Sequence, residues 1–399
     1  MTASETVPTC PVHNFNPYDE LPVGEKLARY DELRAEAPVI YNSIANGYYI
    51  VTRHEDILRT LQNAETFSSR AIEVFSPEPD YKWIPETLDG SEHYQWRQQL
   101  GPLFSPRAIT RLDEALRQRA VELIEEIAKQ DSCDFMADFA LQYPTSIFLE
   151  LMGLPWDHIG QFMQWEDDIL HGTGTAEEIL EKQAAAMAAV NEYFTEVIAA
   201  RRADPGDDLI SSALGFEIDG EPVSDADVGS FCLLMFMAGL DTVSATLGLS
   251  FYHLARNPED RRRIVEDFDL IPTAIEEFIR AYAIVVPARQ ATRDTEIAGC
   301  PIKAGEMIAV PLNMATRDEN EFVDATTVKI DRTPNRHIGF GAGPHRCLGS
   351  HLARRELRIA LEEWHRRIPE YRLADGAVPR EAGNMLGIDA LPLVWNRCG

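Results

Sequence analysis

The ten residues 340–349, with the sequence FGAGPHRCLG, constrain this chain more than any other segment. They place Cys347 in a glycine-rich loop directly before a long amphipathic run, 352–368. A cysteine at a helix N-terminus lies at the positive end of the helix dipole, which favours the thiolate over the thiol. The flanking glycines let backbone N–H groups approach the sulfur, and Phe340 can shield it. The loop is therefore expected to present an activated sulfur at the start of a helix.

A thiolate of this kind is the ligand that a haem iron needs if the protein is to cleave an O–O bond. A lone cysteine near glycine would be weak support for such a site. The spacing Phe-x-x-Gly-x-His-x-Cys-x-Gly is long and specific, and it predicts that Cys347 is an iron ligand.

Bulk composition limits the classes of partner. The chain has 399 residues, of which 45% are hydrophobic, so it can bury a substantial core. Its formal net charge of −28 makes nucleic acid or an anionic membrane a poor partner. The segment 1–17 is polar, lacks the pattern of a signal peptide and is interpreted as a short tail. No apolar stretch of about 18 residues is evident, so we expect a soluble, cytoplasmic protein with no membrane span.

The cysteines are scattered and include no Cys-x-x-Cys pair, which argues against a zinc ribbon. A disulfide framework is not expected in a chain of this length. Apart from Cys347, the cysteines are interpreted as ordinary thiols: Cys10, Cys133, Cys232, Cys300 and Cys398.

Hydrophobic periodicity predicts a mostly helical chain with a small β-rich subregion. Helices are expected over 25–35, 54–62 and, with interruptions, 107–203, where breaks are placed at Pro144, Pro155 and 172–174. Short strands are expected at 48–52, 296–298, 307–310 and 391–395, and a coil at 326–337. No linker or internal repeat is evident, so the chain is interpreted as one domain, 1–399.

A helix of about 30 residues is expected from Ser224 to Arg256, with a capping box formed by Ser224 and Asp227 and a stop at 257–258. Its middle is apolar on nearly every face, so it should cross the core. The pair Asp241–Thr242 within it needs partners, because burial of either side chain alone costs free energy.

The adjacent Gly239 allows another group to approach the backbone, and the Thr242 hydroxyl can compete for the carbonyl of Ala238 and open a local groove. Such a groove suits proton delivery to a reacting oxygen. The alternative is a satisfied polar pair with a packing glycine.

Taken together, these motifs resemble the cytochrome P450 family, in its soluble bacterial form. The stretches 348–356 and 390–395 are most similar to the camphor-hydroxylase branch. The resemblance implies the single-domain fold of that family, a triangular helical prism, with haem b bound through Cys347. It also implies a cofactor-binding set: Phe340, Gly341, Gly239, His93, Arg97, Arg289 and His345. The residues 89–92 depart from the Asp-Pro turn usual in relatives, which bears on the contact of His93.

The resemblance also assigns roles outside the haem pocket. Glu277 and Arg280, three apart on a helix, would join Arg332 in a triad that ties this helix to the loop before the cysteine. Thr242 would hydrogen-bond the reacting oxygen, and Asp241 would connect it to a proton source. The implied reaction is monooxygenation with dioxygen.

Two electrons must then come from outside, because no Gly-x-Gly-x-x-Gly follows a strand and no reductase is fused. The partner expected is a small acidic ferredoxin, of the [2Fe-2S] type or similar, with its reductase. Arg346, Arg354 and Arg355 are candidates for its docking surface, although a solvated helix face is an equal alternative.

By resemblance, the substrate pocket is lined by residues from several segments: Leu234, Met237, Val285, Met385, Phe75, Trp83 and Tyr81. Tyr81 falls where the camphor-hydroxylase branch places a tyrosine that hydrogen-bonds a substrate ketone. A mostly apolar pocket with one phenol favours a terpenoid, norisoprenoid or small aromatic ketone. The segment 172–174 is a candidate hinge for a lid.

Two other functions are compatible with a haem loop: a peroxygenase driven by hydrogen peroxide, and a haem sensor without turnover. The acid–alcohol pair Asp241–Thr242 argues against the first, because a peroxygenase does not need it. Turnover with electrons from a ferredoxin would exclude the second.

Overall fold

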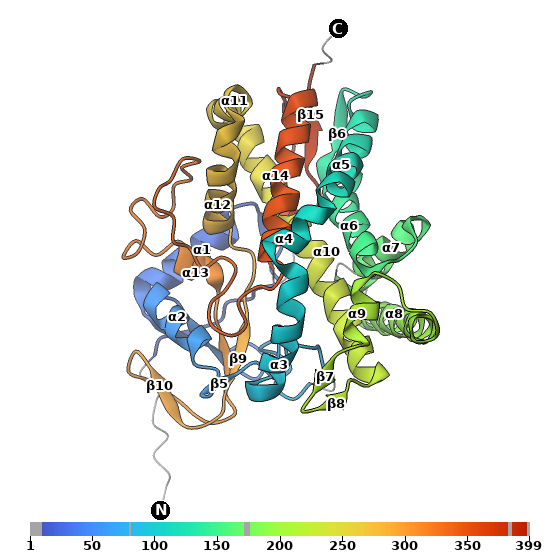
Figure 1. The fold of residues 1–399 in the computed structure, drawn as a ribbon. Helices are drawn as coiled ribbons and strands as arrows, with labels where there is room; N and C mark the ends of the chain where they lie inside the picture. The colour runs from blue at the N-terminus through green and yellow to red at the C-terminus, as the bar shows by residue number, and fades with distance from the viewer. Residues whose placement is uncertain (1–9, 80, 171–175, 382–384, 397–399) are drawn as a thin grey trace, which may run out of the picture.

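A 32-residue helix, α10 (Asp225–Arg256), runs diagonally through the middle of the molecule (Figure 1). The computed structural model describes residues 10–79, 81–170, 176–381 and 385–396. The Ser224 hydroxyl accepts a hydrogen bond from the backbone N–H of Asp227, as the capping pattern predicts, and the helix is continuous to Arg256. Helices pack against it from several sides, which explains why it is apolar around most of its circumference.

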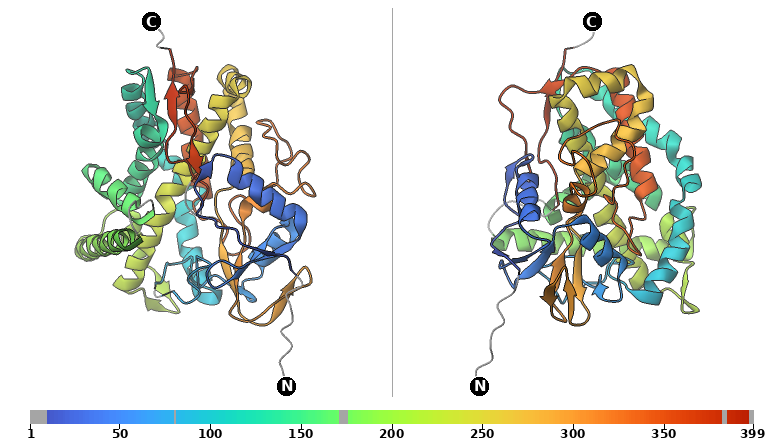
Figure 2. Two further views of the ribbon diagram at one scale, coloured as in Figure 1. Left: turned by 180° about the vertical axis from the view of Figure 1, so that it is seen from behind. Right: turned by 90° about the vertical axis from the view of Figure 1, so that its left-hand side faces the viewer.

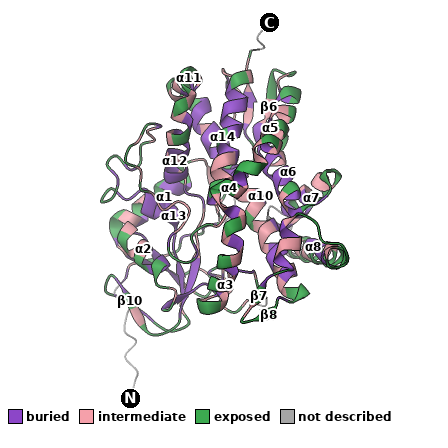
Figure 3. Ribbon diagram, viewed as in Figure 1, coloured by how far each residue is buried: buried purple, intermediate pink, exposed green. Residues whose placement is uncertain are grey.

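The remaining larger helices lie around α10 (Figure 2). They are α3 (Gly90–Leu100), α5 (Asp113–Ile127), α6 (Gln142–Met152), α7 (Ile159–Leu170), α8 (Ala176–Ala203), α11 (Pro258–Glu266), α12 (Ile271–Ala281) and α14 (Ser350–Arg367). In Figure 3 the inner faces of α10, α12 and α14 are buried. The mostly helical fold with a β-rich subregion is as the sequence predicts.

The β-rich region gathers strands from both ends of the chain. A six-stranded sheet has the order β1-β3-β4-β12-β9-β5. Its strands are β1 (Val12–His13), β3 (Val39–Asn42), β4 (Tyr48–Val51), β12 (Met307–Ala309), β9 (Ala288–Ala291) and β5 (Phe67–Ser68). The helices α1 (Glu25–Glu36) and α2 (His54–Gln62) belong to the same half of the molecule. The expected strands at 48–52 and 307–310 are thus neighbours in one sheet.

Four smaller ladders complete the β structure. The expected strand at 391–395 is β15 (Pro392–Val394), which lies between β13 (Arg372–Leu373) and β6 (Ser132–Asp134). The one at 296–298 is β10 (Thr295–Ile297), paired with β11 (Cys300–Ile302). The other two ladders pair β2 (Leu21–Pro22) with β14 (Arg380–Glu381), and β7 (Glu217–Ile218) with β8 (Glu221–Pro222).

Three local expectations differ from the structure. Pro144 does not break a helix: it lies in the first turn of α6, where a missing N–H is tolerated, and a π-helical turn, Met136–Ala140, precedes it. The break near Pro155 is present, because α6 ends at Gly153 in the left-handed conformation. The candidate hinge 172–174 lies outside the described residues.

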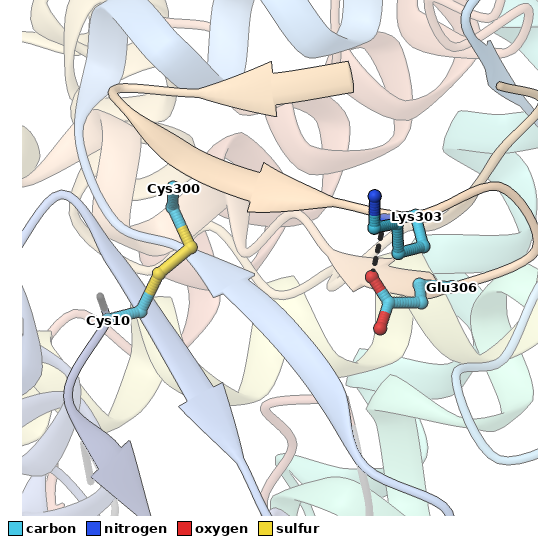
Figure 4. The surroundings of a disulfide bond; sticks show 4 residues. All are labelled: Cys10, Cys300, Lys303 and Glu306. Carbon is cyan, nitrogen blue, oxygen red and sulfur yellow. Dashed lines mark hydrogen bonds between the residues drawn. A yellow bond between two sulfur atoms is a disulfide. The ribbon is translucent and has the colours of Figure 1, made fainter. Parts of the chain in front are cut away.

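The expectation that no disulfide forms is wrong. Cys10 and Cys300 are bonded across 290 residues of sequence, and the bond ties the segment before β1 to the β10–β11 hairpin (Figure 4). Both residues are buried. Cys133 and Cys232 are free thiols, as expected, and Cys398 lies outside the described residues.

Within the described part of the chain, α10 alone is long and apolar enough by composition to cross a membrane. Asp241 interrupts the apolar run of this helix, so it is not an uninterrupted apolar stretch of about 18 residues, and the prediction that none occurs is not contradicted. More than half of the apolar window is buried inside the protein, which is the pattern of a core helix.

Candidate active site

The cysteine loop is closed by its own backbone. The N–H of Cys347 donates to the carbonyl of Phe340 at 2.9 Å, and α14 begins three residues later. Gly341 and Gly343 have φ values of 72° and 70°, which only glycine adopts freely. A Cβ on Gly343 would lie 2.3 Å from the carbonyl oxygen of Leu61 at the end of α2, so the loop approaches α2 too closely for a side chain. These contacts fix where the sulfur sits.

The thiol itself is less activated than the helix-dipole argument predicts. Cys347 is partly open to solvent, but protein atoms surround its sulfur, and this desolvation raises the pKa of the thiol. The backbone N–H of Gly349 and the guanidinium of Arg97 lower that pKa and only partly offset the effect. The loop therefore does not stabilise the thiolate by itself, and a metal cation is the group whose binding would deprotonate it.

A buried charge cluster ties α12 to the segment before the loop. Glu277 and Arg280 are both fully buried, and two parallel hydrogen bonds of 2.7 and 2.8 Å join them. Arg332 donates to the same carboxylate at 2.9 Å, and the backbone N–H of Lys329 and the amide of Asn335 donate to it as well. The structure thus brings the three expected residues together, with both arginines donating to one acid.

The four cations expected near the cysteine also come together. His93 on α3 stacks on His345 of the loop, with ring centroids 4.0 Å apart. Arg289 on β9 is 3% exposed, and Arg97 donates to the backbone carbonyl of Arg346 at 2.6 Å. Burial lowers the pKa of His93 to about 4, with further lowering by His345 and Arg97. His93 is therefore a neutral hydrogen-bonding side chain at neutral pH.

The unusual residues before His93 do not displace it. α3 begins at Gly90, which has a φ of 59°, a conformation that glycine adopts without strain. The carboxylate of Asp89 accepts from the backbone N–H of Ser69 and the hydroxyl of Ser68, so it anchors the start of the helix to β5. His93 is 4% exposed and lies beside His345.

Two observations fit this cluster to a ligand with carboxylates. Both ring nitrogens of His345 are buried without a hydrogen-bond partner among the described residues. Glu86, which the sequence analysis missed, lies 3.7 Å from His345, beyond hydrogen-bonding distance. Burial would raise the pKa of Glu86, but His345 and Arg289 outweigh it and hold that pKa below its ordinary value. A region that stabilises one carboxylate in this way suits the propionates of a haem.

On α10, the Thr242 hydroxyl donates to the carbonyl of Ala238 at 2.9 Å, as the sequence predicts. The helix is nevertheless continuous through these residues, so the expected groove is not a break in its secondary structure. A Cβ on Gly239 would lie 3.6 Å from Phe148, an ordinary contact. No described protein atom therefore requires glycine at this position, which weakens the alternative of a packing glycine.

A second acid lies beside Asp241. Glu166 on α7 is 4% exposed, and the Asp241 charge is among the causes that raise its pKa well above the ordinary value, after burial. The sequence analysis missed Glu166, although it lies one helical turn after Phe162, a residue on the buried face of α7. The four-residue spacing from Phe162 is the sequence signal that could have identified Glu166 as buried.

The expected pocket residues fall into two groups. Leu234 and Met237 on α10 are half-buried, as are Val285, Met385 and Trp83, and the rings of Tyr81 and Trp83 lie 5.3 Å apart. Phe75 instead packs against Tyr18 and Tyr48, each with ring centroids 5.5 Å away, within the β-rich region. The role of Phe75 in roofing the pocket therefore stays a prediction.

The arginines expected to dock a partner are largely paired. Arg354 binds Glu276 through two hydrogen bonds and lies over the ring of Phe340. Arg355 is joined to Asp113. Arg346 is exposed and has no ion pair among the described residues. The positive patch is thus narrower than the sequence suggests, because acids on α12 and α5 offset the charges of Arg354 and Arg355.

With this geometry in place, the similarity to known proteins is specific. The family model for cytochrome P450 matches residues 168–366. A probable cytochrome P450 127A1 of Sinorhizobium fredii is 37% identical over 383 residues, covering 94% of this chain and 91% of that protein. A steroid C26-monooxygenase of Mycolicibacterium smegmatis is 32% identical and covers 92% of each chain. The crystal structure of CYP101J2 is 30% identical, with a TM-score of 0.89 over 99% of this chain and 100% of that one.

The chain therefore belongs to the cytochrome P450 family. It is an oxidoreductase of the monooxygenase class, and its family uses a haem with a thiolate ligand.

Proposed function

We propose that this protein, as a single catalytic domain spanning 1–399, activates dioxygen with two externally supplied electrons and hydroxylates a small hydrophobic substrate in the cytoplasm. The observation that carries this proposal is the cysteine loop: Cys347 lies at the start of α14, in a loop closed by its own backbone. The Thr242 hydroxyl on α10 supplies the second functional element.

The cofactor that fits is haem b, held by Cys347 as the iron ligand. Its two propionates would accept hydrogen bonds from Arg97, Arg289, His93 and His345, the last of which has buried, unpartnered ring nitrogens. Phe340, Gly341 and Gly239 would line its two faces. When bound, the haem supplies dioxygen binding and O–O bond cleavage, and the thiolate donates electron density that favours this cleavage.

The protein's own contribution is to hold and move a proton. Thr242 presents a hydroxyl that the carbonyl of Ala238 orients from one side, so its oxygen can accept a proton or a hydrogen bond from the other. Asp241, its neighbour on α10, would pass protons to it.

Substrate choice is argued from the residues around α10 and from the relatives. Among the latter are a steroid C26-monooxygenase and a methyl-branched lipid omega-hydroxylase of Mycobacterium tuberculosis, 31% identical, while the similar folds include CYP101J2 and CYP101C1. We favour the camphor-hydroxylase branch and a compact terpenoid, norisoprenoid or aromatic ketone. Tyr81, whose ring is tilted against that of Trp83, would hydrogen-bond the carbonyl of this substrate.

Electrons would come from a small acidic ferredoxin with its reductase. Arg346 is the residue that best supports docking beside the cysteine loop, because it is exposed and carries no described ion pair. Arg354 and Arg355 would contribute less, because their charges are offset by Glu276 and Asp113.

The test combines a spectrum with turnover. The reduced protein under carbon monoxide should show the strongly red-shifted Soret band of a thiolate-ligated haem. With ferredoxin, reductase and a terpenoid ketone, Thr242→Ala should lower product formed per NAD(P)H consumed by about tenfold or more and release hydrogen peroxide instead. The neighbouring Thr246→Ala serves as a control, because its hydroxyl bonds the Thr242 carbonyl one turn further along α10.

Unchanged coupling in Thr242→Ala would remove the proton-delivery role. Product formed with hydrogen peroxide alone, and not with ferredoxin, would mean that the protein works as a peroxygenase. Haem binding without turnover in either system would leave only a sensor.

A further inference from the structure

Glu166 is a buried acid whose carboxyl oxygen Oε1 accepts no hydrogen bond from the described residues. It lies on α7 (Ile159–Leu170) and is 4% exposed. Carboxylates in protein interiors are normally paired with cations or several donors, because burial of an uncompensated charge is expensive. Burial of this kind favours the protonated, neutral form of the acid.

The packing of α7 places Glu166 beside Asp241. Phe162 on α7 contacts Phe236 on α10, with ring centroids 5.6 Å apart and the rings nearly perpendicular. Glu166 lies one helical turn beyond Phe162, and Asp241 lies just over one turn beyond Phe236. The Asp241 charge acts on the Glu166 carboxyl, in agreement with this placement.

The charged groups near Glu166 that are described all raise its pKa. The described groups that bear on Glu166 are Asp241 and, on its own helix, the exposed Asp167, and both are acids. Burial first, and these two negative neighbours second, raise the pKa of Glu166 well above its ordinary value. A purely structural acid would gain from a nearby cation, and none of the described groups that act on Glu166 is one.

We propose that Glu166 stores a proton and supplies it to Asp241, and so acts as a positioning residue for proton delivery through the Asp241–Thr242 pair. This inference rests on the proposed function of that pair and extends it to a second helix. The store is placed where water is scarce, so its proton is available without a chain of ordered solvent.

The transfer is balanced and moves no electrons. The Glu166 carboxyl gives its proton to the Asp241 carboxylate, and Asp241 gives a proton to the Thr242 hydroxyl, which passes its own to the reacting oxygen. After both transfers Thr242 is a hydroxyl again and Glu166 and Asp241 are both carboxylates, so Glu166 takes up one proton from solvent to complete the cycle. Two neighbouring acids that share one proton can release it and take it up again in this way.

The experiment uses the haem-loaded protein with ferredoxin and reductase and, as probe, the terpenoid ketone that gives the largest spin-state shift. Glu166→Gln keeps the shape and polarity of the side chain but cannot release a proton. We expect its product yield per NAD(P)H to fall by about five- to tenfold, with a matching rise in hydrogen peroxide. Glu166→Asp, which keeps the acid, should recover part of the yield, and Asp167→Asn, one residue along, should behave as wild type.

A second readout does not depend on turnover. The infrared spectrum of the wild-type protein should contain the C=O stretch of a protonated carboxyl that is absent from Glu166→Gln and present in Asp167→Asn. Raising the pH should remove this band, and coupling should fall over the same pH range. Absence of the band at every pH would overturn the proposal, because Glu166 would then hold no proton to give.

The outcomes separate this inference from the function on which it rests. If Thr242→Ala and Asp241→Asn uncouple the enzyme while Glu166→Gln does not, proton delivery stands and the role of Glu166 is rejected. If none of the three variants uncouples, the proposed function of the pair fails as well. If Glu166→Gln loses the red-shifted carbon monoxide band, its effect is structural and the proposal is also overturned.

Discussion

The two sides of the candidate site treat buried acids in opposite ways. On the cysteine side, Glu277 is fully buried and accepts hydrogen bonds from two arginines, an amide and a backbone N–H. On the α10 side, Glu166 is also buried, but its described neighbours are other acids. The same residue type is thus locked by charge pairing in one place and left with a proton in the other.

This difference shows how one fold can both hold a cofactor and deliver protons to it. A satisfied ion cluster has one low-energy arrangement, which suits a loop that must hold a sulfur in position. An acid without donors has two accessible protonation states, which suits a proton source. If this is correct, the hydrogen-bond and charge partners of a buried acid, rather than its position in the fold, decide whether it is fixed as a carboxylate or keeps a proton.

The largest effect should follow loss of the sulfur. Cys347→Ala removes the iron ligand, so the red-shifted Soret band under carbon monoxide should disappear and turnover should fall by more than about a hundredfold, beyond what changes around a ligand usually cause. Circular dichroism should show that the helices remain. The half-buried free thiol Cys133, changed to serine, is the control and should keep the band. A retained band in Cys347→Ala would place the iron elsewhere.

The second-largest effect tests the cysteine side, where ion pairs fix Glu277. Arg280→Ala leaves Glu277 buried with fewer partners, so the free energy of unfolding in denaturant should fall by about 3–5 kcal/mol. The control is Arg262→Ala, which removes an exposed pair with Glu259 at the same three-residue spacing and should have a much smaller effect on stability. Equal losses in the two variants would mean that the buried triad does not hold the loop.

Much of the candidate site could be predicted from sequence where it depends on local spacing. The loop 340–349, the helix from Asp225 to Arg256 and the Thr242–Ala238 hydrogen bond all follow from residues near one another in the chain. The resemblance to known proteins supplied Arg332, whose contact with Glu277 spans 55 residues.

The features that sequence did not predict depend on distant packing. The bond between Cys10 and Cys300 needs the segment before β1 and the β10–β11 hairpin to meet, and no spacing rule indicates this. Glu166 is one of three consecutive acids, of which only it is buried, and its neighbour Asp241 is 75 residues away. Helix crossing, rather than local pattern, brought these carboxyls together.

A third buried acid sharpens the comparison, because it lies on the cysteine side without the partners of Glu277. Glu356 on α14 is 3% exposed, and burial raises its pKa to about 8. A raised pKa in the folded state means that stability is greatest at low pH and is lost as the pH rises towards 8. Relative to wild type, Glu356→Gln should therefore gain about 2–4 kcal/mol in the free energy of unfolding between pH 5 and pH 8.5.

Denaturant unfolding at several pH values measures this gain, and Glu362→Gln on the same helix is the control. Arg358 and Arg117 hold the pKa of Glu362 below its ordinary value, so its replacement should lose stability above about pH 4.5 instead. If Glu356→Gln shows no pH-dependent gain, position on the cysteine side, and not pairing, would decide how an acid behaves.

The smallest effect concerns stability at Glu166. Because this acid is neutral in the fold and has no donor to lose, Glu166→Gln should change the free energy of unfolding by about 1 kcal/mol or less at pH 5. Its raised pKa means that wild type alone loses stability as the pH rises, so the variant should become the more stable protein in alkaline solution. Denaturant melts at pH 5 and pH 9 measure the crossover. A large loss at pH 5 would mean that Glu166 is fixed by contacts like those of Glu277, and the two sides of the site would then be built alike.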